Sequence, residues 1–533
     1  MKRIQLFALA AALMMAAACS EPLNEAAEEA TPPNEAVAMT TDGRTVADVN
    51  MERFAEILSK AVAQNRDLRV FFKEQATEKI DNDYNVFYPI AKRKAVGGET
   101  MEQMLAKYAD ETELAEIQAA VPLLNVHLPE LAGSTVADLD PDDEELPVLY
   151  NNVMYYDGEP IDTLAADEVP GFNILVVTES STIRKRSGLS KSTSDLALDD
   201  EYEYVSASCK PETKSLSKVA EYENAASMYY NDGLFPKSRL CSELIDAYNV
   251  AKSNKFAVRT ATYYNWKSLN DKKTDVNLNI HERIFRLKLD SRFLERYYDE
   301  LTCKNGESKM FNNSTSNKVN ELSRSTVITN LVNGRMFEFK FVVVTPNGNN
   351  GSQHPKTIPI LVKAQDLFDF KINTDKRHKT KFRHTKYTYT FVSGGTKSKW
   401  VYLNKNCSDI DRWQIEKGMY QKYISVYLCD PKAGSSQTVS ESITFGQSVT
   451  TQVSQTLSMG VSTSLSGTNT ISVFNSVSYT TSYSDRLLGT FTVDFFTDPI
   501  IKSISSDNQV TLPEYKIGDE LWISILPDRY YNW

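Results

Sequence analysis

Cysteine has the widest choice of chemistry in this chain, because a thiol can be acylated, oxidised to a disulfide or used as a nucleophile. Six cysteines occur, at positions 19, 209, 241, 303, 407 and 429. Five of them follow Cys19, so at least one stays unpaired within a monomer. Cys407 and Cys429 flank a predicted strand, and we expect them to form a disulfide in an oxidising compartment.

Cys19 lies at the end of an N-terminal export signal. Lys2 and Arg3 precede an apolar run from Ile4 to Met15, and three alanines follow directly before the cysteine. The run has roughly 12 residues, fewer than the ~20 that a spanning helix needs, so it predicts a cleaved signal peptide over residues 1–18. The junction resembles the lipobox of bacterial lipoproteins. That resemblance implies cleavage before Cys19, lipid on its thiol, and a membrane anchor without any protein span.

The segment after the anchor is acidic, contains Pro32 and Pro33, and has no aromatic residue before position 50. Such a composition buries too little apolar surface to order itself, so residues 19–47 are predicted to be a disordered tether. Its acidic start resembles the export tags of surface-exposed lipoproteins in some Gram-negative bacteria. The resemblance implies an outer-membrane lipoprotein that is exposed on the cell surface.

Catalytic and metal-binding patterns are absent from the sequence. His281-Glu282 begins like a zinc motif, but position 285, where a helix would place the second histidine, is Phe285. No nucleophile elbow, P-loop or dinucleotide fingerprint occurs. We therefore expect no metal, no cofactor and no enzymatic activity; a secreted hydrolase with an unrecognised site is the weakest alternative.

Charge divides the chain into an acidic and a basic part. The formal net charge is −11, yet residues 1–200 hold 17 Lys and Arg against 36 Asp and Glu, which leaves 42 against 34 for residues 201–533. The basic part is the better candidate for an anionic glycan or lipid, and no nucleic-acid motif accompanies it. The candidate side chains cluster in one aromatic-interleaved stretch: Lys376, Arg377, Lys379, Lys381 and Arg383. A solvated strand face explains the same cluster without a partner.

Residues 438–484 have the most informative pattern. Of these residues 23 are Ser or Thr, and the one charge is Glu441. Apolar side chains fall on odd positions from Val439 to Leu465, and again from Ile471 to Tyr483, with Phe474 as the exception. Because strand side chains alternate between faces, the pattern predicts a long hairpin with one apolar and one hydroxyl face, turning at Ser466–Asn469.

The hairpin resembles the Ser/Thr-rich insertion segment of aerolysin-type β-pore-forming proteins. That resemblance implies that the hairpin leaves an elongated β domain, inserts into a membrane and joins a barrel built by several copies. The residues then expected to face lipid are Val449, Val453, Leu457, Val461, Leu465, Ile471, Val473 and Val477. The competing interpretation is a long two-stranded element of an ordinary β-sandwich.

Periodicity along the rest of the chain predicts an α+β fold that is mainly β. A small N-terminal α+β domain is predicted over 48–183. It begins with helical spacing from Asp48 to Lys79, continues with a helix that a capping box at Thr100 and Gln103 opens and that runs through Tyr108, and has a third helix at 111–120. A strand at 172–177 closes it. A polar segment at 184–204 is the predicted linker. Strand patterns separated by Asn-Gly turns predict antiparallel sandwich-type β structure, divided into a central domain at 205–400 and a C-terminal domain with the hairpin at 401–533.

These patterns together favour a non-enzymatic surface lipoprotein that acts as a binding module through its β-rich part. The alternative is a lipid-tethered pore former that inserts residues 439–483 and assembles as a homo-oligomer.

Overall fold

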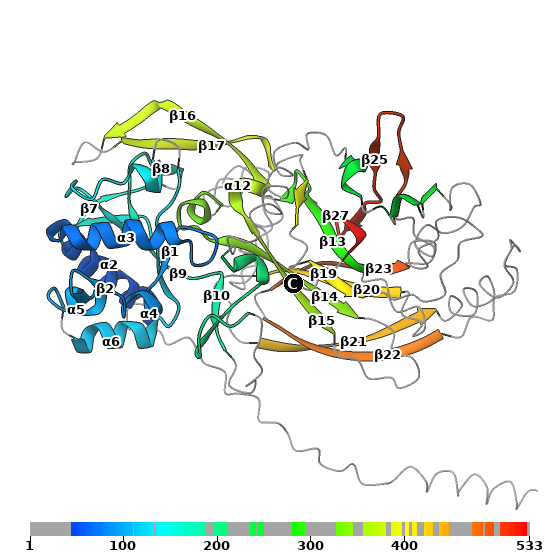
Figure 1. The fold of residues 1–533 in the computed structure, drawn as a ribbon, viewed down its shortest axis with the longest axis horizontal. Helices are drawn as coiled ribbons and strands as arrows, with labels where there is room; N and C mark the ends of the chain where they lie inside the picture. Colours follow the sequence, from blue (N-terminus) through cyan, green and yellow to red (C-terminus); the bar gives the residue numbers. More distant parts are fainter. Residues whose placement is uncertain are drawn as a thin grey trace, which may run out of the picture. The chain divides into compact units, whose positions relative to one another are not determined.

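The structure is a computed structural model, and it describes residues 44–186, 196–211, 235–249, 280–293, 327–344, 355–379, 385–396, 400–403, 408–412, 421–429, 436–446, 472–482, 485–494 and 501–529, apart from positions 110, 132–133, 166, 241, 243 and 247. Helices gather in the first part of the chain and antiparallel sheets dominate the remainder (Figure 1). The predicted α+β, mainly β class is confirmed.

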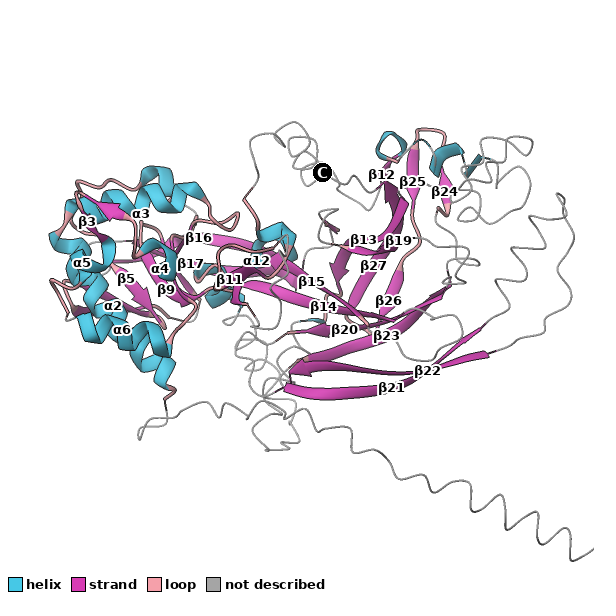
Figure 2. Ribbon diagram, turned by 60° about the horizontal axis from the view of Figure 1, so that its bottom comes forward, coloured by secondary structure: helices cyan, strands magenta, loops and turns pink. Residues whose placement is uncertain are grey.

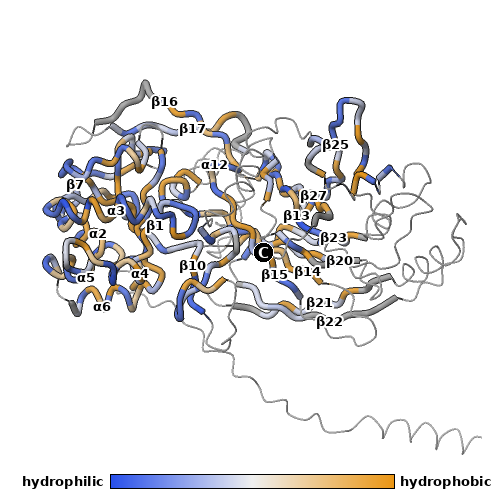
Figure 3. The backbone as a smooth tube through the Cα atoms, in the orientation of Figure 1, coloured by the Kyte–Doolittle hydropathy of each residue, from blue (hydrophilic) through white to orange (hydrophobic). Residues whose placement is uncertain are grey.

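Two consecutive helices replace the single helix predicted from residue 48 to residue 79. Helix α2 (Val46–Gln64) begins at the N-cap Thr45, whose hydroxyl accepts a hydrogen bond from the Asp48 amide, and α3 (Arg66–Glu78) follows. Asn65 separates them with extended backbone at φ −130°, and its side chain accepts from the amides of Asp67 and Leu68. The apolar period continues across this break because both helices pack on one core, so periodicity alone did not reveal it. In Figure 3 apolar and polar colours alternate along both helices.

These helices cover a six-stranded sheet in the N-terminal lobe, which we define as residues 44–211. Its strand order is β1 (Asn85–Phe87), β4 (Leu124–His127), β9 (Leu175–Glu179), β5 (Val148–Tyr150), β6 (Val153–Tyr156) and β7 (Glu159–Thr163). Helices α4 (Tyr88–Ala91), α5 (Met101–Leu105) and α6 (Glu111–Ala120), the short strands β2 (Ala95–Val96) and β3 (Glu99–Thr100), and the 3-10 turn η1 (Val136–Asp138) complete it. The Thr100–Gln103 capping box is present, although α5 ends at Leu105 and not at Tyr108.

Both ends of the predicted linker at 184–204 belong to strands. Strand β10 (Ile183–Lys185) pairs with β11 (Tyr202–Tyr204), and the 3-10 turn η2 (Ala207–Cys209) follows. Tyr202 and Tyr204 are buried, which gives that end of the segment an apolar anchor that its polar composition concealed.

The β-rich part contains two antiparallel sheets that share one core (Figure 2). The first sheet, in spatial order, comprises β15 (Lys356–Lys363), β14 (Met336–Val344), β20 (Gln421–Leu428) and β23 (Arg486–Asp494). The second comprises β18 (Val401–Tyr402), β13 (Ile280–Leu289), β27 (Leu521–Arg529) and β26 (Tyr515–Ile517), with β19 (Asp409–Arg412) also pairing with β13. Phe339, Phe341, Leu287 and Ile523 are among the buried side chains between them. We call this unit the sandwich.

The sandwich mixes strands from both of the predicted β domains. Strand β13 pairs with β27, and β14 pairs with β20, so each pairing crosses position 400. The separation of 205–400 from 401–533 therefore does not correspond to a boundary in the described fold. Sequence order misled the prediction because antiparallel strands pair across long connections.

Smaller elements complete the described structure. A short helix α12 (Ala364–Leu367) leads into β16 (Phe368–Lys379), which pairs with β17 (Thr385–Thr396), and β17 pairs with β8 (Glu168–Pro170) of the N-terminal lobe. Strands β12 (Phe235–Pro236), β25 (Gln509–Thr511) and β24 (Ser503–Ile504) form a separate sheet, and η5 (Lys237–Arg239) follows β12. No described helix is long and apolar enough to cross a membrane.

Candidate functional site: a ribbon packed on the outside of the sandwich

The predicted hairpin is present as a two-stranded ribbon made of β21 (Ser436–Gly446) and β22 (Ser472–Ser482). We use "ribbon" for these two strands. Val439 lies opposite Tyr479 and Phe445 opposite Val473, so odd positions pair with odd positions throughout. Cross-strand partners lie on the same face of a sheet, and the two odd-numbered apolar series therefore share one face.

The observed register differs from the one that a tight turn at the predicted position would give. Gly446 lies opposite Ser472, whereas a hairpin turning tightly at Ser466–Asn469 would place Leu465 opposite Thr470. A turn of that length pairs odd with even positions, which would put the apolar residues of the two arms on opposite faces. Residues 447–471 lie outside the described residues.

The described side chains of the ribbon alternate between exposed and buried. Thr438, Ser440, Ser442, Ser478 and Thr480 are exposed. On the other face, Ile443 and Tyr479 are buried against Val342 and Val344 of β14 and Tyr427 of β20, with Val439 and Tyr423 partly buried beside them. This cluster occupies the outer face of the first sheet, the face that does not contribute to the sandwich core. Figures 1 and 2 both show the ribbon along that sheet.

Two tyrosines join the ribbon to the sheet by a directional contact. The hydroxyl oxygens of Tyr427 and Tyr479 are 2.8 Å apart, and the rings pack edge to face with centroids 6.2 Å apart. Because both rings are buried, this hydrogen bond forms away from water and also satisfies two polar atoms.

A second polar contact lies where β22 leads into β23. The carboxylate of Asp485 accepts from Lys340 Nζ of β14 and from Thr481 Oγ1 of β22, each at 2.7 Å. The Asp485 side chain is only 2% exposed. Burial lowers the pKa of Lys340, but the neighbouring Cys429, Asp485 and Glu338 outweigh that effect and raise it overall. Lys340 is thus held in its charged form.

The ribbon is inserted between two strands that pair with each other. Strands β20 and β23 are joined directly from Gln421–Asp494 to Leu428–Arg486, although the ribbon lies between them in the sequence. In the described part of the chain, β21 and β22 form a sheet of their own and pair with no third strand. The ribbon is therefore attached to the sandwich by side chains and by its two connections.

The structure locates some of the predicted site residues. Val473 and Val477 belong to β22, while Val449, Val453, Leu457, Val461, Leu465, Ile471 and the lipidation candidate Cys19 lie outside the described residues. Of the predicted basic cluster, Lys376, Arg377 and Lys379 belong to β16, and Lys381 and Arg383 lie outside the described residues.

The predicted disulfide between Cys407 and Cys429 stays a prediction. Cys429 is a free thiol in the described structure, and Cys407 lies outside the described residues. Burial, together with the nearby carboxylate of Glu338, raises the pKa of the Cys429 thiol, so this thiol stays protonated and unreactive at neutral pH.

Sequence reasoning missed a buried polar cluster in the N-terminal lobe. Asp81, 1% exposed, accepts from Asn85 Nδ2 at 2.8 Å and from the Thr182 hydroxyl, and His127 Nδ1 lies 2.9 Å from Asn85 Oδ1. Lys363 of β15 forms an ion pair with Asp83 at 2.9 Å. Asp81, Asp83 and Asn85 lie close together in the sequence, but their partners at 127, 182 and 363 are distant and form no motif with them, so no local signal could have indicated the cluster.

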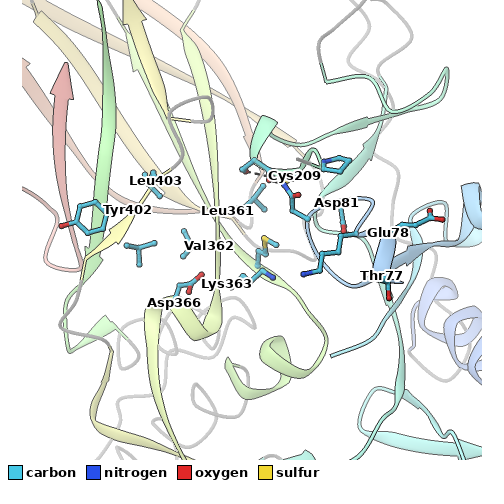
Figure 4. A pocket seen from close by; sticks show the side chains of 16 residues that line it. Thr77, Glu78, Asp81, Cys209, Leu361, Val362, Lys363, Asp366, Tyr402 and Leu403 are labelled. Carbon is cyan, nitrogen blue, oxygen red and sulfur yellow. Dashed lines mark hydrogen bonds between the residues drawn. The ribbon is translucent and has the colours of Figure 1, made fainter. Parts of the chain in front are cut away.

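A cavity of about 690 Å³ opens beside this cluster (Figure 4). Glu78 and Asp81 from α3 and the loop after it, Lys363 from β15, Asp366 from α12 and Tyr402 from β18 contribute to its lining. The charges have both signs, so the lining favours no single class of ligand. No group of His, Cys, Asp or Glu side chains suited to a metal ion occurs among the described residues.

Comparison of the chain with protein-family models, with curated proteins and with solved structures finds no significant match.

Proposed function

We propose that this chain is a lipid-tethered surface protein that perforates membranes by inserting the ribbon and the residues between its strands. The observation that carries the proposal is the topology of the ribbon: it forms its own two-stranded sheet, while β20 and β23 pair directly without it. Within the described residues, departure of the ribbon from the sandwich would break no ladder of backbone hydrogen bonds with a neighbouring strand.

The packing energy is compatible with such a movement. Seven apolar or aromatic side chains form the contact, five of them buried. At roughly 1.5 kcal/mol for each large side chain, uncovering them costs on the order of 10 kcal/mol as an upper bound. The apolar face of the ribbon would be buried again in the hydrocarbon of a bilayer, so much of this cost is offset.

Once uncovered, the outer face of the first sheet would also tolerate contact with water. Strand β14 contributes Glu338 and Lys340 to it alongside Val342 and Val344, and β20 contributes Ser425, whose buried hydroxyl has no hydrogen-bond partner in the described structure. Uncovering Ser425 would give that hydroxyl access to water, which favours release. A permanent core face seldom carries so many polar groups.

Dye release from liposomes tests the proposal. In the hairpin pattern Val453 and Leu457 fall on the apolar face, so the double variant Val453→Asp, Leu457→Asp puts two charges at bilayer depth, at a cost on the order of 2 kcal/mol each. We expect the wild type to release dye and this variant to stay folded but inactive.

The matched control places the same charges on the hydroxyl face, as Ser454→Asp with Ser458→Asp. A barrel lumen accepts charge, so this control should still release dye. A wild type that never releases dye, or two double variants with equal activity, would refute membrane insertion and favour the surface binding module. Unfolding of the Val453, Leu457 variant would instead indicate that these side chains pack in a soluble core.

A further inference from the structure

We propose that Asp485 is the positioning residue that keeps the ribbon stored on the sandwich, by accepting the Thr481 hydroxyl while it is itself fixed by Lys340. The inference deepens the proposed function, on which it rests, because it names the contact that must break first for the ribbon to leave.

The location of Asp485 suits this role. It lies between β22 and β23, where the chain passes from the ribbon to the sandwich. Two groups from different parts of the fold donate to its Oδ2 atom: Lys340 belongs to the sheet, and Thr481 belongs to the ribbon. Thr481 is 2% exposed, so water competes little for its hydroxyl. The carboxylate of Asp485 thus connects the ribbon to the first sheet of the sandwich.

The nature of the contact makes it directional. The apolar contacts of Ile443, Val439 and Tyr479 weaken gradually as the ribbon slides, since burial has no preferred direction. A hydrogen bond to a charged acceptor depends on both distance and angle and is among the strongest in proteins. The Asp485–Thr481 bond therefore fixes the ribbon in one register on the sheet.

Lys340 also faces groups other than Asp485. Glu338 lies on the same strand and is partly buried, and this burial raises the pKa of its carboxyl; Cys429 and Arg184 lie close enough to Glu338 to lower that pKa in part. Lys340 has Glu338 as an alternative partner. Asp485→Asn removes the charge that holds Lys340 and leaves Thr481 a neutral amide oxygen, which is a weaker acceptor and is no longer fixed by the lysine.

Hydrogen exchange of the full chain in solution, without any membrane, tests this role directly. We expect the ribbon amides in 436–446 and 472–482 to exchange about tenfold faster in Asp485→Asn than in the wild type. Thr481→Val, which removes the hydroxyl and keeps the shape, should have the same effect. Thr481→Ser, which restores the hydroxyl, should return exchange to within about twofold of the wild type.

The control variant is Lys92→Met, which breaks an ion pair of similar length, 2.8 Å to Glu102, at a similarly shielded lysine in the N-terminal lobe. It should leave ribbon exchange unchanged. The sandwich strands β13 and β27 should exchange at the wild-type rate in every variant, whereas a general loss of stability would accelerate their exchange too.

The inference is overturned if Asp485→Asn and Thr481→Val leave ribbon exchange at the wild-type rate, or if β13 and β27 accelerate as much as the ribbon does. Dye release separates this result from the fate of the proposed function. Faster ribbon exchange in variants that never release dye supports the role of Asp485 and refutes pore formation, whereas equal exchange with active dye release refutes the role of Asp485 alone.

Discussion

At the scale of single residues, Asp81 and His127 are the two buried titratable groups with the clearest pH dependence. Burial raises the pKa of Asp81 to about 6, while burial lowers the pKa of His127 to about 4 in spite of the nearby Asp83 carboxylate. As the pH falls from 6 toward 4, folded Asp81 takes up a proton that the unfolded chain does not, which stabilises the fold. Over the same range unfolded His127 takes up a proton that the folded chain does not, which destabilises it.

Replacing Asp81 by Asn therefore removes the stabilising half of this pair. From pH 7.5 to pH 4.5, the free energy of unfolding of Asp81→Asn should fall by about 2 kcal/mol more than that of the wild type. The variant keeps the destabilising His127 contribution and lacks the stabilising one of Asp81. Urea unfolding followed by tyrosine and tryptophan fluorescence at the two pH values measures the difference. A gap between variant and wild type that does not change with pH would show that Asp81 is not the group that titrates.

Residue-scale prediction from sequence succeeded where a rule is local. The Thr100–Gln103 capping box needs only four consecutive residues, and the alternation of the ribbon needs only parity. Tyr427 and Tyr479, by contrast, meet because two separate strands pack together. No spacing in the sequence encodes that contact, so the anchor of the ribbon had to come from the structure.

At the scale of elements, sequence patterns located individual strands, but apart from the hairpin they did not indicate which strands pair. The sequence pattern predicts a strand over 336–344, and β14 has these bounds, because seven of its nine side chains are apolar. The Asn333-Gly334 pair, predicted as a hairpin turn, instead follows a helical segment at 327–332 and leads into β14. Gly334 has φ +64°, and a Cβ there would lie 2.5 Å from the His127 ring, so glycine is needed for close approach to the N-terminal lobe.

A cross-link across the ribbon tests whether it acts as one element. Ser440 and Ser478 are register partners with hydroxyl oxygens 3.0 Å apart on the exposed face, so Ser440→Cys with Ser478→Cys directs two thiols toward each other. If the ribbon leaves and inserts as a paired unit, the oxidised double variant should release dye from liposomes as the reduced form does. Release only after reduction would show that the strands must separate, and Ser440→Cys alone, oxidised in parallel, controls for Cys429.

At the scale of the whole molecule, the N-terminal lobe and the sandwich share packed contacts. Strand β17 pairs with β8. Lys386 Nζ lies 3.1 Å from a carboxylate oxygen of Glu168 and 3.3 Å from one of Asp162. One apolar cluster contains Leu149 as well as Ile328. Sequence reasoning separated the chain at composition changes, and it missed these contacts because they join strands that are distant in the sequence.

Anchoring is also a property of the whole chain. We expect Cys19→Ala to abolish lipidation and to move the protein from the detergent phase to the aqueous phase in phase separation, because the variant lacks the proposed lipid anchor. Retention of this variant in the detergent phase would contradict the lipoprotein assignment. Cys209→Ala, which changes a cysteine within the folded lobe, should partition as the wild type does.

Electron microscopy of the Cys19→Ala protein on liposomes tests the central claim most directly, since the soluble form can reach a membrane on its own. Insertion of one ribbon from each of several copies predicts closed rings in the bilayer, absent when the Val453→Asp, Leu457→Asp variant is added instead. Liposomes that carry scattered single particles or none, with both proteins, would contradict the account and leave the ribbon as a fixed outer layer of the sandwich.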